Sequence, residues 1–226
     1  MRYLIKVVKK LFLLFPLMMM VFFLKAITVN SAPESGKIQT ELSKLAEINK
    51  RGKKVNSAQL PSPYDKLLTQ PLMTKSLEKY YGRRAIIKTI FASQDPEHHT
   101  YHRSIVMLVD GNKERNDPDF AQIKKEALVV EIAFITINFK ELPKSLIEKV
   151  LHTNIPFGKL LMHYQIRTLS RDRTYYKIQC DSTLAALINC PLNTPIYGRT
   201  NTLISADNKK WLAHVVEILP NPLEIK

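Results

Sequence analysis

The hydrophobic pattern from residue 62 onward is mainly that of β-strands. Short runs rich in β-branched and aromatic residues are separated by polar stretches containing Gly, Pro, Asn or Asp, which is typical of strands joined by turns. The last two runs are connected by Ala206–Lys210, a length that favours a hairpin. We therefore predict strands at Ala85–Ala92, Tyr101–Val109, Ala127–Asn138, Thr174–Cys180, Ile196–Ser205 and Trp211–Leu219.

Three segments have a helical period. Apolar residues recur at every third or fourth position between residues 64 and 81, and Gly82 ends that pattern. Glu141–Leu151 predicts a second helix with a proline in its first turn, and Ile155–Met162 predicts a turn followed by a short helix. Because the strands follow one another closely while the helices cluster early and in mid-chain, we predict an α+β domain. It would be an antiparallel β-sheet with helices on one face.

The first 32 residues have the layout of an export signal. A basic start precedes Leu11–Leu24, a run of 14 residues without a charge, and small residues follow it. The run is shorter than the roughly 20 residues that a helix needs to cross a bilayer, so we prefer a cleaved signal peptide over an N-terminal anchor. We expect an exported protein that is periplasmic, secreted or membrane-anchored, with membrane contact only through an uncleaved N-terminal segment.

The stretch from residue 33 to residue 61 is polar and lysine-rich. We predict a polar linker here, and a weak helix through Leu42, Leu45 and Ile48 is the alternative. The folded domain would then cover residues 62–222.

The chain is basic, with a formal net charge of +14 over 226 residues. Without residues 1–32, 29 basic residues stand against 20 acidic ones, which leaves +9. The basic residues are scattered among acidic ones and no zinc-finger, helix-turn-helix or RNA-binding signature occurs, so we expect no nucleic-acid partner. With six glycines and no glycine-rich phosphate loop, we also expect no cofactor.

Two pairs of side chains are candidates for a metal site or a disulfide. His98 and His102 fall on one side of an extended strand, but no acid or cysteine completes a ligand set, so we predict no metal site. Cys180 and Cys190 are the two cysteines of the chain. In an exported protein they form a possible disulfide, and two buried thiols are the alternative.

Two predicted strands carry a charge on an apolar face. With a side-chain period of two, Glu217 shares a face with Trp211, Val215 and Leu219, and Arg103 likewise shares a face with apolar neighbours. An unpaired charge in such a place costs several kcal/mol, so each needs a partner, a ligand or a proton. The two residues suggest the polar ends of a small pocket; a structural ion pair is the alternative.

The motifs, read in order, resemble the chorismate pyruvate-lyase family and its superfamily, which includes effector-binding domains of some bacterial transcription regulators. The resemblance spans about residues 62–222, and the ordered set is more specific than any one motif. Its members are Leu67–Glu78 with a Met-Thr pair, Tyr101–Arg103, Ile155–Gly158, Leu169–Asp172, Tyr197–Arg199 and Val216–Pro220.

This resemblance implies a fold, a site and a reaction. The fold would be chorismate lyase-like, matching the sheet predicted above. In the lyases an arginine holds the ring carboxylate and a glutamate meets the ring hydroxyl, which implies Arg103 and Glu217 as catalytic and substrate-binding residues. The turn before the mid-chain helix implies Phe157 and Gly158 as further substrate-binding residues.

The chain also departs from the family pattern. The strand after the one with Arg103 lacks the family's second carboxylate-binding arginine, and Glu131 is its only charge. Arg199 is the candidate replacement for substrate binding.

Three functions follow as hypotheses. The first is an exported lyase-like enzyme that eliminates pyruvate from chorismate or a related enolpyruvyl aromatic acid, giving a hydroxybenzoate. The second is a non-catalytic envelope module that binds a small aromatic or acidic ligand. The third is an exported interaction protein.

Overall fold

The computed structural model describes residues 32–112, 115 and 117–221. The predicted signal peptide or anchor therefore lies outside the described residues, except for its last residue. Residues 41–226 form one compact unit, distinct from residues 1–40, and the fold described below is that of the larger unit. Within the described chain, no helix combines the length and the apolar composition that crossing a membrane requires.

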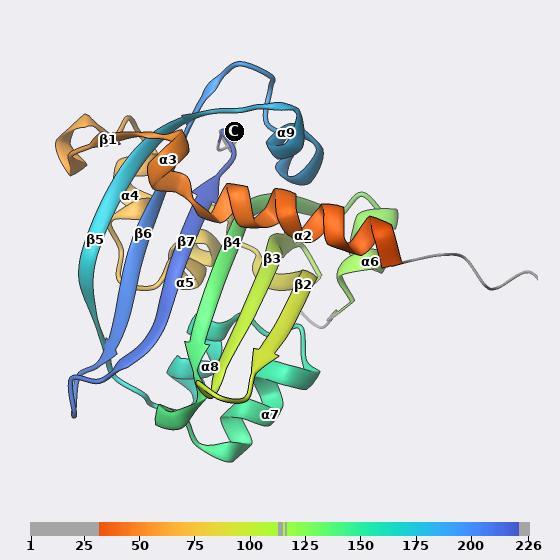
Figure 1. Ribbon diagram of the computed structural model, residues 1–226. Coiled ribbons are helices and arrows are strands. Elements are labelled where there is room, and N and C mark those ends of the chain that lie inside the picture. The colour runs from red at the N-terminus through yellow and green to blue at the C-terminus, as the bar shows by residue number, and fades with distance from the viewer. Residues whose placement is uncertain (1–31, 113–114, 116, 222–226) are drawn as a thin grey trace, which may run out of the picture. The chain divides into compact units, whose positions relative to one another are not determined.

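The unit is built on one antiparallel sheet, which within the described residues has seven strands in the order β1-β5-β6-β7-β4-β3-β2 (Figure 1). The six predicted strands are confirmed, and β1 was not predicted. All neighbouring strands pair antiparallel. The strands are β1 (Lys53–Val55), β2 (Arg84–Asp95), β3 (Thr100–Asp110), β4 (Ala127–Asn138), β5 (Thr168–Gln179), β6 (Pro195–Ser205) and β7 (Trp211–Leu219).

The predicted helices cover one face of this sheet. They are α4 (Tyr64–Leu68), α5 (Met73–Tyr81), α7 (Lys144–His152) and α8 (Phe157–His163). The stretch predicted as one helix from residue 64 is divided into α4 and α5 near Pro71, because proline supplies no backbone donor to a continuing helix. Gly82 ends α5 with φ +61°, a left-handed conformation that glycine adopts without strain. The α+β class with an antiparallel sheet is thus confirmed.

The opposite face is covered too, by α3 (Ile48–Arg51), α6 (Pro118–Ile123), α9 (Ser182–Ile188) and the end of α2 (Ala32–Ala46). Short 3-10 turns lie at Ser57–Gln59 and Phe139–Glu141. The prediction of a polar linker over residues 33–61 is wrong where Leu42, Leu45 and Ile48 are buried in the core on this face. The alternative, a helix through these residues, agrees with α2 and α3.

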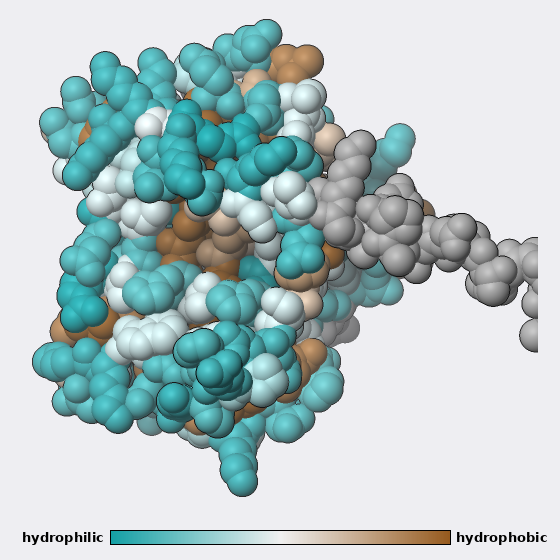
Figure 2. Space-filling model, in the orientation of Figure 1, coloured by the Kyte–Doolittle hydropathy of each residue, from teal (hydrophilic) through white to brown (hydrophobic). Residues whose placement is uncertain are grey.

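Burial on both faces explains the character of the central strands. In β3, Ile105 and Met107 pack toward α4 and α5, whereas Val106 and Leu108 pack toward α6 and α9. A strand covered on both sides is apolar at consecutive positions instead of alternating. On the face turned to the viewer in Figure 1, hydrophilic surface surrounds a small apolar recess (Figure 2).

Cys180 and Cys190 are joined by a disulfide, with their Cα atoms 6.1 Å apart. The bond closes a loop around α9 and both residues are buried in the core beneath that helix. Among the described residues there is no free cysteine.

Candidate functional site

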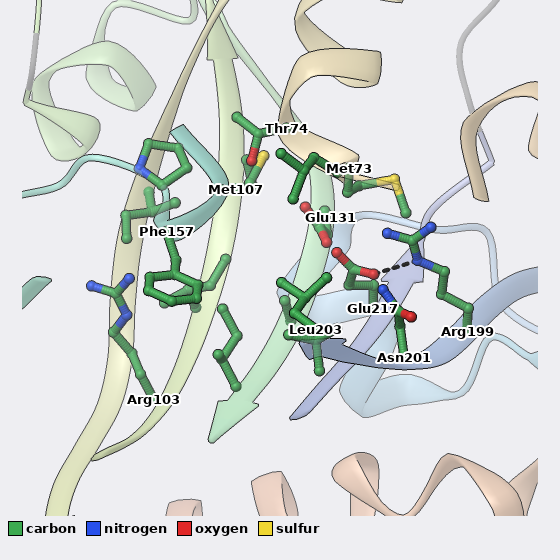
Figure 3. A pocket seen from close by; sticks show the side chains of 18 of the residues that line it. Met73, Thr74, Arg103, Met107, Glu131, Phe157, Arg199, Asn201, Leu203 and Glu217 are labelled. Atoms are coloured by element: carbon green, nitrogen blue, oxygen red, sulfur yellow. Dashed lines mark hydrogen bonds and ion pairs between the residues drawn. The ribbon is translucent and has the colours of Figure 1, made fainter. Parts of the chain in front are cut away.

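A small cavity lies between the sheet and the helices of the first face (Figure 3). Its volume is about 40 Å³, which is room for roughly three ordered water molecules. β3, β4, β6 and β7 form its floor, and α5, α8 and the turn between α4 and α5 form its roof. Its charged walls come from Arg103, Glu131, Arg199 and Glu217.

All five residues predicted for the site line this cavity: Arg103, Phe157, Gly158, Arg199 and Glu217. Gly158 lets α8 approach α5 closely, because a Cβ atom at that position would lie 3.3 Å from the Thr74 hydroxyl oxygen. The structure therefore brings the predicted residues together around one space. Their roles toward a substrate stay predictions.

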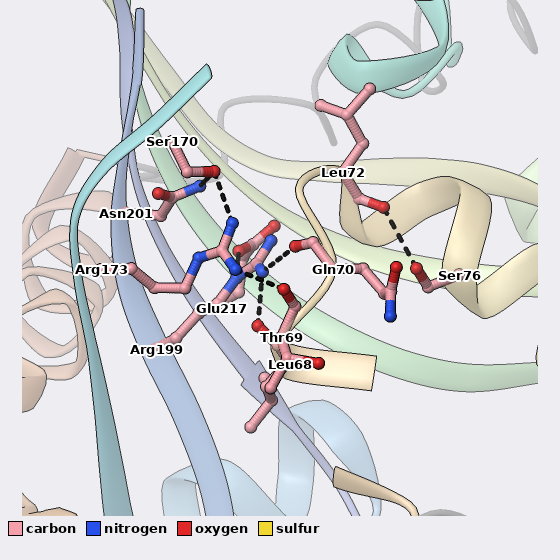
Figure 4. A network of polar contacts seen from close by, with 10 residues as sticks. All are labelled: Leu68, Thr69, Gln70, Leu72, Ser76, Ser170, Arg173, Arg199, Asn201 and Glu217. Carbon is pink, nitrogen blue, oxygen red and sulfur yellow. Dashed lines mark hydrogen bonds and ion pairs between the residues drawn. The ribbon is translucent and has the colours of Figure 1, made fainter. Parts of the chain in front are cut away.

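Arg199 and Glu217 form a buried ion pair. They face each other directly on β6 and β7, and the Arg199 Nε donates to Glu217 Oε2 over 2.5 Å. Arg199 Nη1 also donates to the backbone carbonyls of Leu68, over 2.6 Å, and Gln70 (Figure 4). Arg199 therefore holds the end of α4 as well as the carboxylate, with its Nε and Nη1 both bonded within the protein.

This ion pair could have been found in the sequence. If the hairpin loop Ala206–Lys210 places Ser205 opposite Trp211, equal steps back along both strands place Arg199 opposite Glu217. The observed register agrees at this pair, although it shifts by one residue close to the hairpin. The missing step was to use hairpin register in addition to strand phase.

A second arginine supports the same turn. Arg173 donates to the carbonyl of Thr69 and to the Ser170 hydroxyl, which also accepts from the Asn201 amide at 3.3 Å. Figure 4 shows the two guanidinium groups side by side at the carbonyl end of α4. Cations are favourable there because the last carbonyls of a helix have no partner within it.

Glu131 also lines the cavity, although the sequence did not indicate that it belongs to the site. Met107 pairs with Glu131 whereas Leu108 pairs with Val129, so a bulge at this point shifts the phase of β4. Ala133 pairs with Glu217, which makes Glu131 and Glu217 diagonal neighbours on one face. Figure 3 shows their carboxyl groups turned toward each other.

Burial raises the pKa of Glu131 well above its usual range, and the charge of Glu217 and a hydrogen bond to it act in the same direction. The nearby charge of Arg199 lowers the pKa, but less than burial and the charge of Glu217 raise it. Two carboxyl groups this close do not readily ionise together. We infer that the pair retains one proton, so that its single negative charge is balanced by Arg199.

Arg103 is buried without a charged partner. It is 2% exposed, and its Nη1 donates to the carbonyl of Val150 over 3.1 Å. Its Nε and Nη2 are buried and have no partner. Burial lowers the pKa of Arg103, but a guanidinium keeps its charge in proteins. Arg103 lies beside Phe157, across the cavity from Glu217 (Figure 3).

The two histidines considered as metal ligands are separated. His98 is exposed and contacts Asp95, whereas the His102 ring contacts the Thr136 hydroxyl. In the part of the chain that the structure describes, no group of three or more His, Cys, Asp or Glu residues is placed to hold a metal ion.

An open depression outside the cavity shares two of its wall residues. Pro71 and Leu72 line both spaces. The depression has a volume of about 620 Å³, and Lys66, Lys75 and Lys79 stand around it. The turn between α4 and α5 therefore separates the cavity from a basic part of the surface.

No protein-family model matches this chain, and no curated protein does either. Solved structures show a distant likeness. PhnF from Mycobacterium smegmatis matches at 13% identity with a TM-score of 0.46, over 68% of this chain and 65% of that one, so the match spans less than two thirds of PhnF. The effector domain of PhnF alone matches at 13% identity and a TM-score of 0.45, over 67% and 89% of the two chains.

A GntR-family transcriptional regulator from Enterococcus faecalis V583 matches at 11% identity and a TM-score of 0.36, over 62% of this chain and 99% of that one. These matches are too distant to identify a family for this chain. What the molecule itself shows is an antiparallel α+β domain with a small cavity lined by charged side chains.

Proposed function

We propose that this domain binds a small carboxylate in the cavity, with Arg103 as its anchor. The observation that carries the proposal is the buried Arg103 guanidinium, in which two nitrogens, Nε and Nη2, have no partner. Leaving such donors unpaired is unfavourable by about 1–3 kcal/mol, and by more when the group is charged. A carboxylate that accepts two bonds from the guanidinium fork removes this cost.

The size of the cavity favours a ligand of a few heavy atoms. A cavity of roughly 150 Å³ is known to take up benzene, whereas this one has about 40 Å³. An aromatic acid therefore requires the roof to move, but a short acid does not. Of the two ligand classes expected from the sequence, the geometry supports the small acid better than the aromatic one.

The surroundings also suit an anion. Lys66, Lys75 and Lys79 stand around the outer depression, whose lining shares Pro71 and Leu72 with the cavity. Clustered positive charge raises the local concentration of anions and speeds their association. The lysines would act on the approach of the ligand, and Arg103 on its binding.

Elimination of pyruvate from chorismate is the second candidate, because burial raises the pKa of Glu131 and its proton could be exchanged with a substrate. Two features weigh against it. Chorismate has a ring and two carboxylates, but Arg199 is already bonded to Glu217 and to two backbone carbonyls. Release of pyruvate from chorismate by the full-length protein, lost in Arg103→Ala, would favour the lyase over the binding module.

Replacing Arg103 by methionine is expected to weaken the binding of short carboxylates by roughly 10- to 150-fold, since a hydrogen bond to a charged group contributes about 1.5–3 kcal/mol. Propanoate and butanoate are suitable probes, and isothermal titration calorimetry measures the dissociation constant. The fold should not suffer, because methionine fills similar volume and removes a buried unpaired charge.

Arg171→Met is the matched control, since Arg171 is an exposed arginine on β5. Equal loss of binding in both variants, or full binding by Arg103→Met, would contradict the assignment of Arg103 as the anchor.

We also propose that the protein is exported. The basic start and uncharged run of residues 1–24 support this, and so does the disulfide between Cys180 and Cys190, because disulfides persist mainly in oxidising compartments. Fusing residues 1–40 to a reporter that is active only outside the cytoplasm should give an active reporter. A fusion lacking Leu11–Leu24 is the control, and a well-expressed but inactive full fusion would argue against export.

A further inference from the structure

The polar end of the cavity that lies across from Arg103 is rich in hydrogen-bond acceptors. The Glu131 Oε2 and the Asn201 Oδ1 are buried without a partner, and both residues line the cavity. Buried acceptors of this kind are rare in folded proteins and normally have a donor. Once Glu131 is ionised, a ligand group that donates hydrogen bonds would satisfy both atoms.

The nearby cation does not meet this need. Arg199 directs its Nε to Glu217 and its Nη1 to the carbonyls of Leu68 and Gln70. The Asn201 amide nitrogen is likewise used, since it donates to Ser170. The Glu131 Oε2 and the Asn201 Oδ1 therefore receive no hydrogen bond from the protein.

When both acids are ionised, this end of the cavity carries one excess negative charge. Glu131 and Glu217 would carry two negative charges against the single positive charge of Arg199. In the empty cavity a retained proton restores the balance. A ligand with a positive charge restores it equally well, and then the proton can leave.

An ammonium group fits both requirements. It carries one positive charge and three N–H donors, whereas a hydroxyl carries no charge and has one donor. With the acid pair ionised, an ammonium could donate to Glu131, Glu217 and Asn201. The cavity would then hold two opposite ligand charges, each next to its complement, because Arg103 stands across from the acid pair.

We propose that Glu131 and Glu217, with Asn201, form a subsite for a ligand ammonium group, so that the cavity takes a short amino acid lying between these acids and Arg103. This inference rests on the proposed binding of a carboxylate at Arg103. Binding involves no covalent step: the proton held by the acid pair passes to solvent as the ammonium takes its place.

The charged groups that face Glu131 set its pH dependence. Glu217 on β7 and Arg199 on β6 are its neighbours, and Arg103 on β3 completes the charged side chains in the cavity wall. Since a proton must leave for the amine to bind, amine affinity should rise with pH over the range in which the acid pair titrates. The affinity of a matched hydroxy acid should not rise in this way.

The test uses three matched pairs with the full-length protein: glycine with glycolate, 3-aminopropanoate with 3-hydroxypropanoate, and 4-aminobutanoate with 4-hydroxybutanoate. Calorimetry in two buffers of different ionisation enthalpy measures both the dissociation constant and the protons released. We expect one amino acid to bind at least tenfold more tightly than its hydroxy partner, with release of close to one proton.

Glu131→Gln keeps the shape of the side chain but cannot become negative. It should lose the preference for the amine and the proton release, yet still bind the hydroxy acid. Glu148→Gln, on the exposed face of α7, is the matched control. Because the proton count is measured on the natural protein, the test remains decisive even if Glu131→Gln does not fold.

The outcomes separate the two proposals. If a hydroxy acid binds as tightly as its amino partner, or if Glu131→Gln retains the preference, the ammonium subsite is wrong while carboxylate binding stands. If none of the six compounds binds to the natural protein, the proposed function fails and this inference fails with it.

Discussion

Replacing Arg199 by methionine is expected to lower the free energy of unfolding by about 3–5 kcal/mol, the usual effect of removing one partner of a buried ion pair. Arg199 is 1% exposed, so the pair is poorly screened by solvent. Its loss leaves two neighbouring acids without a cation. It also leaves the carbonyls of Leu68 and Gln70 without their donor.

Urea denaturation at neutral pH measures this effect, with exposed Arg171→Met as the control. Adding Glu217→Gln to Arg199→Met should recover part of the lost stability, because the uncompensated negative charge is then gone. A loss below about 1 kcal/mol in the single variant would mean that the pair behaves like an exposed one.

Removing the disulfide is the change with the second-largest expected effect. The double variant Cys180→Ala with Cys190→Ala should lose about 3 kcal/mol of unfolding free energy, by the chain-entropy relation for a loop of this size. The two cysteines are 10 positions apart, so the loop is short. The bond lies in the core on the sheet face opposite the cavity, and the binding of small acids should therefore be unchanged.

A reducing agent provides the control within the same experiment. It should lower the stability of the natural protein toward that of the double variant and leave the double variant unaffected. If reduction changes both proteins equally, or changes neither, the disulfide does not contribute to stability in solution.

The two buried arginines of the cavity have different hydrogen-bond partners. We therefore expect one to act on stability and the other on ligand binding. Arg199 has a carboxylate and two carbonyls as partners, so its removal should act on stability. Arg103 donates to one carbonyl, and two of its nitrogens have no partner. Its removal should therefore act on ligand affinity. The sequence assigned both residues to substrate binding; hairpin register would have indicated the partner of Arg199, but nothing local in the sequence indicates the unpaired state of Arg103.

Much of the architecture follows from local patterns in the sequence. Strand periodicity identified six of the seven strands, and the same period of two placed Arg103 and Glu217 on inward faces. These features depend on neighbouring residues along one strand, where side-chain direction follows from position alone. The end of α5 at Gly82 likewise follows from the local sequence.

Other features needed the tertiary structure, for identifiable reasons. The bulge in β4 that brings Glu131 beside Glu217 arises from pairing with β3 and β7, partners distant in the sequence. The segment around Leu42, Leu45 and Ile48 reads as a polar linker until a sheet face is present to bury three apolar side chains. The closeness of Glu131 and Glu217 and the unpaired nitrogens of Arg103 also result from such contacts. A sequence determines the direction of a side chain within its own strand, but its partners depend on which strands meet.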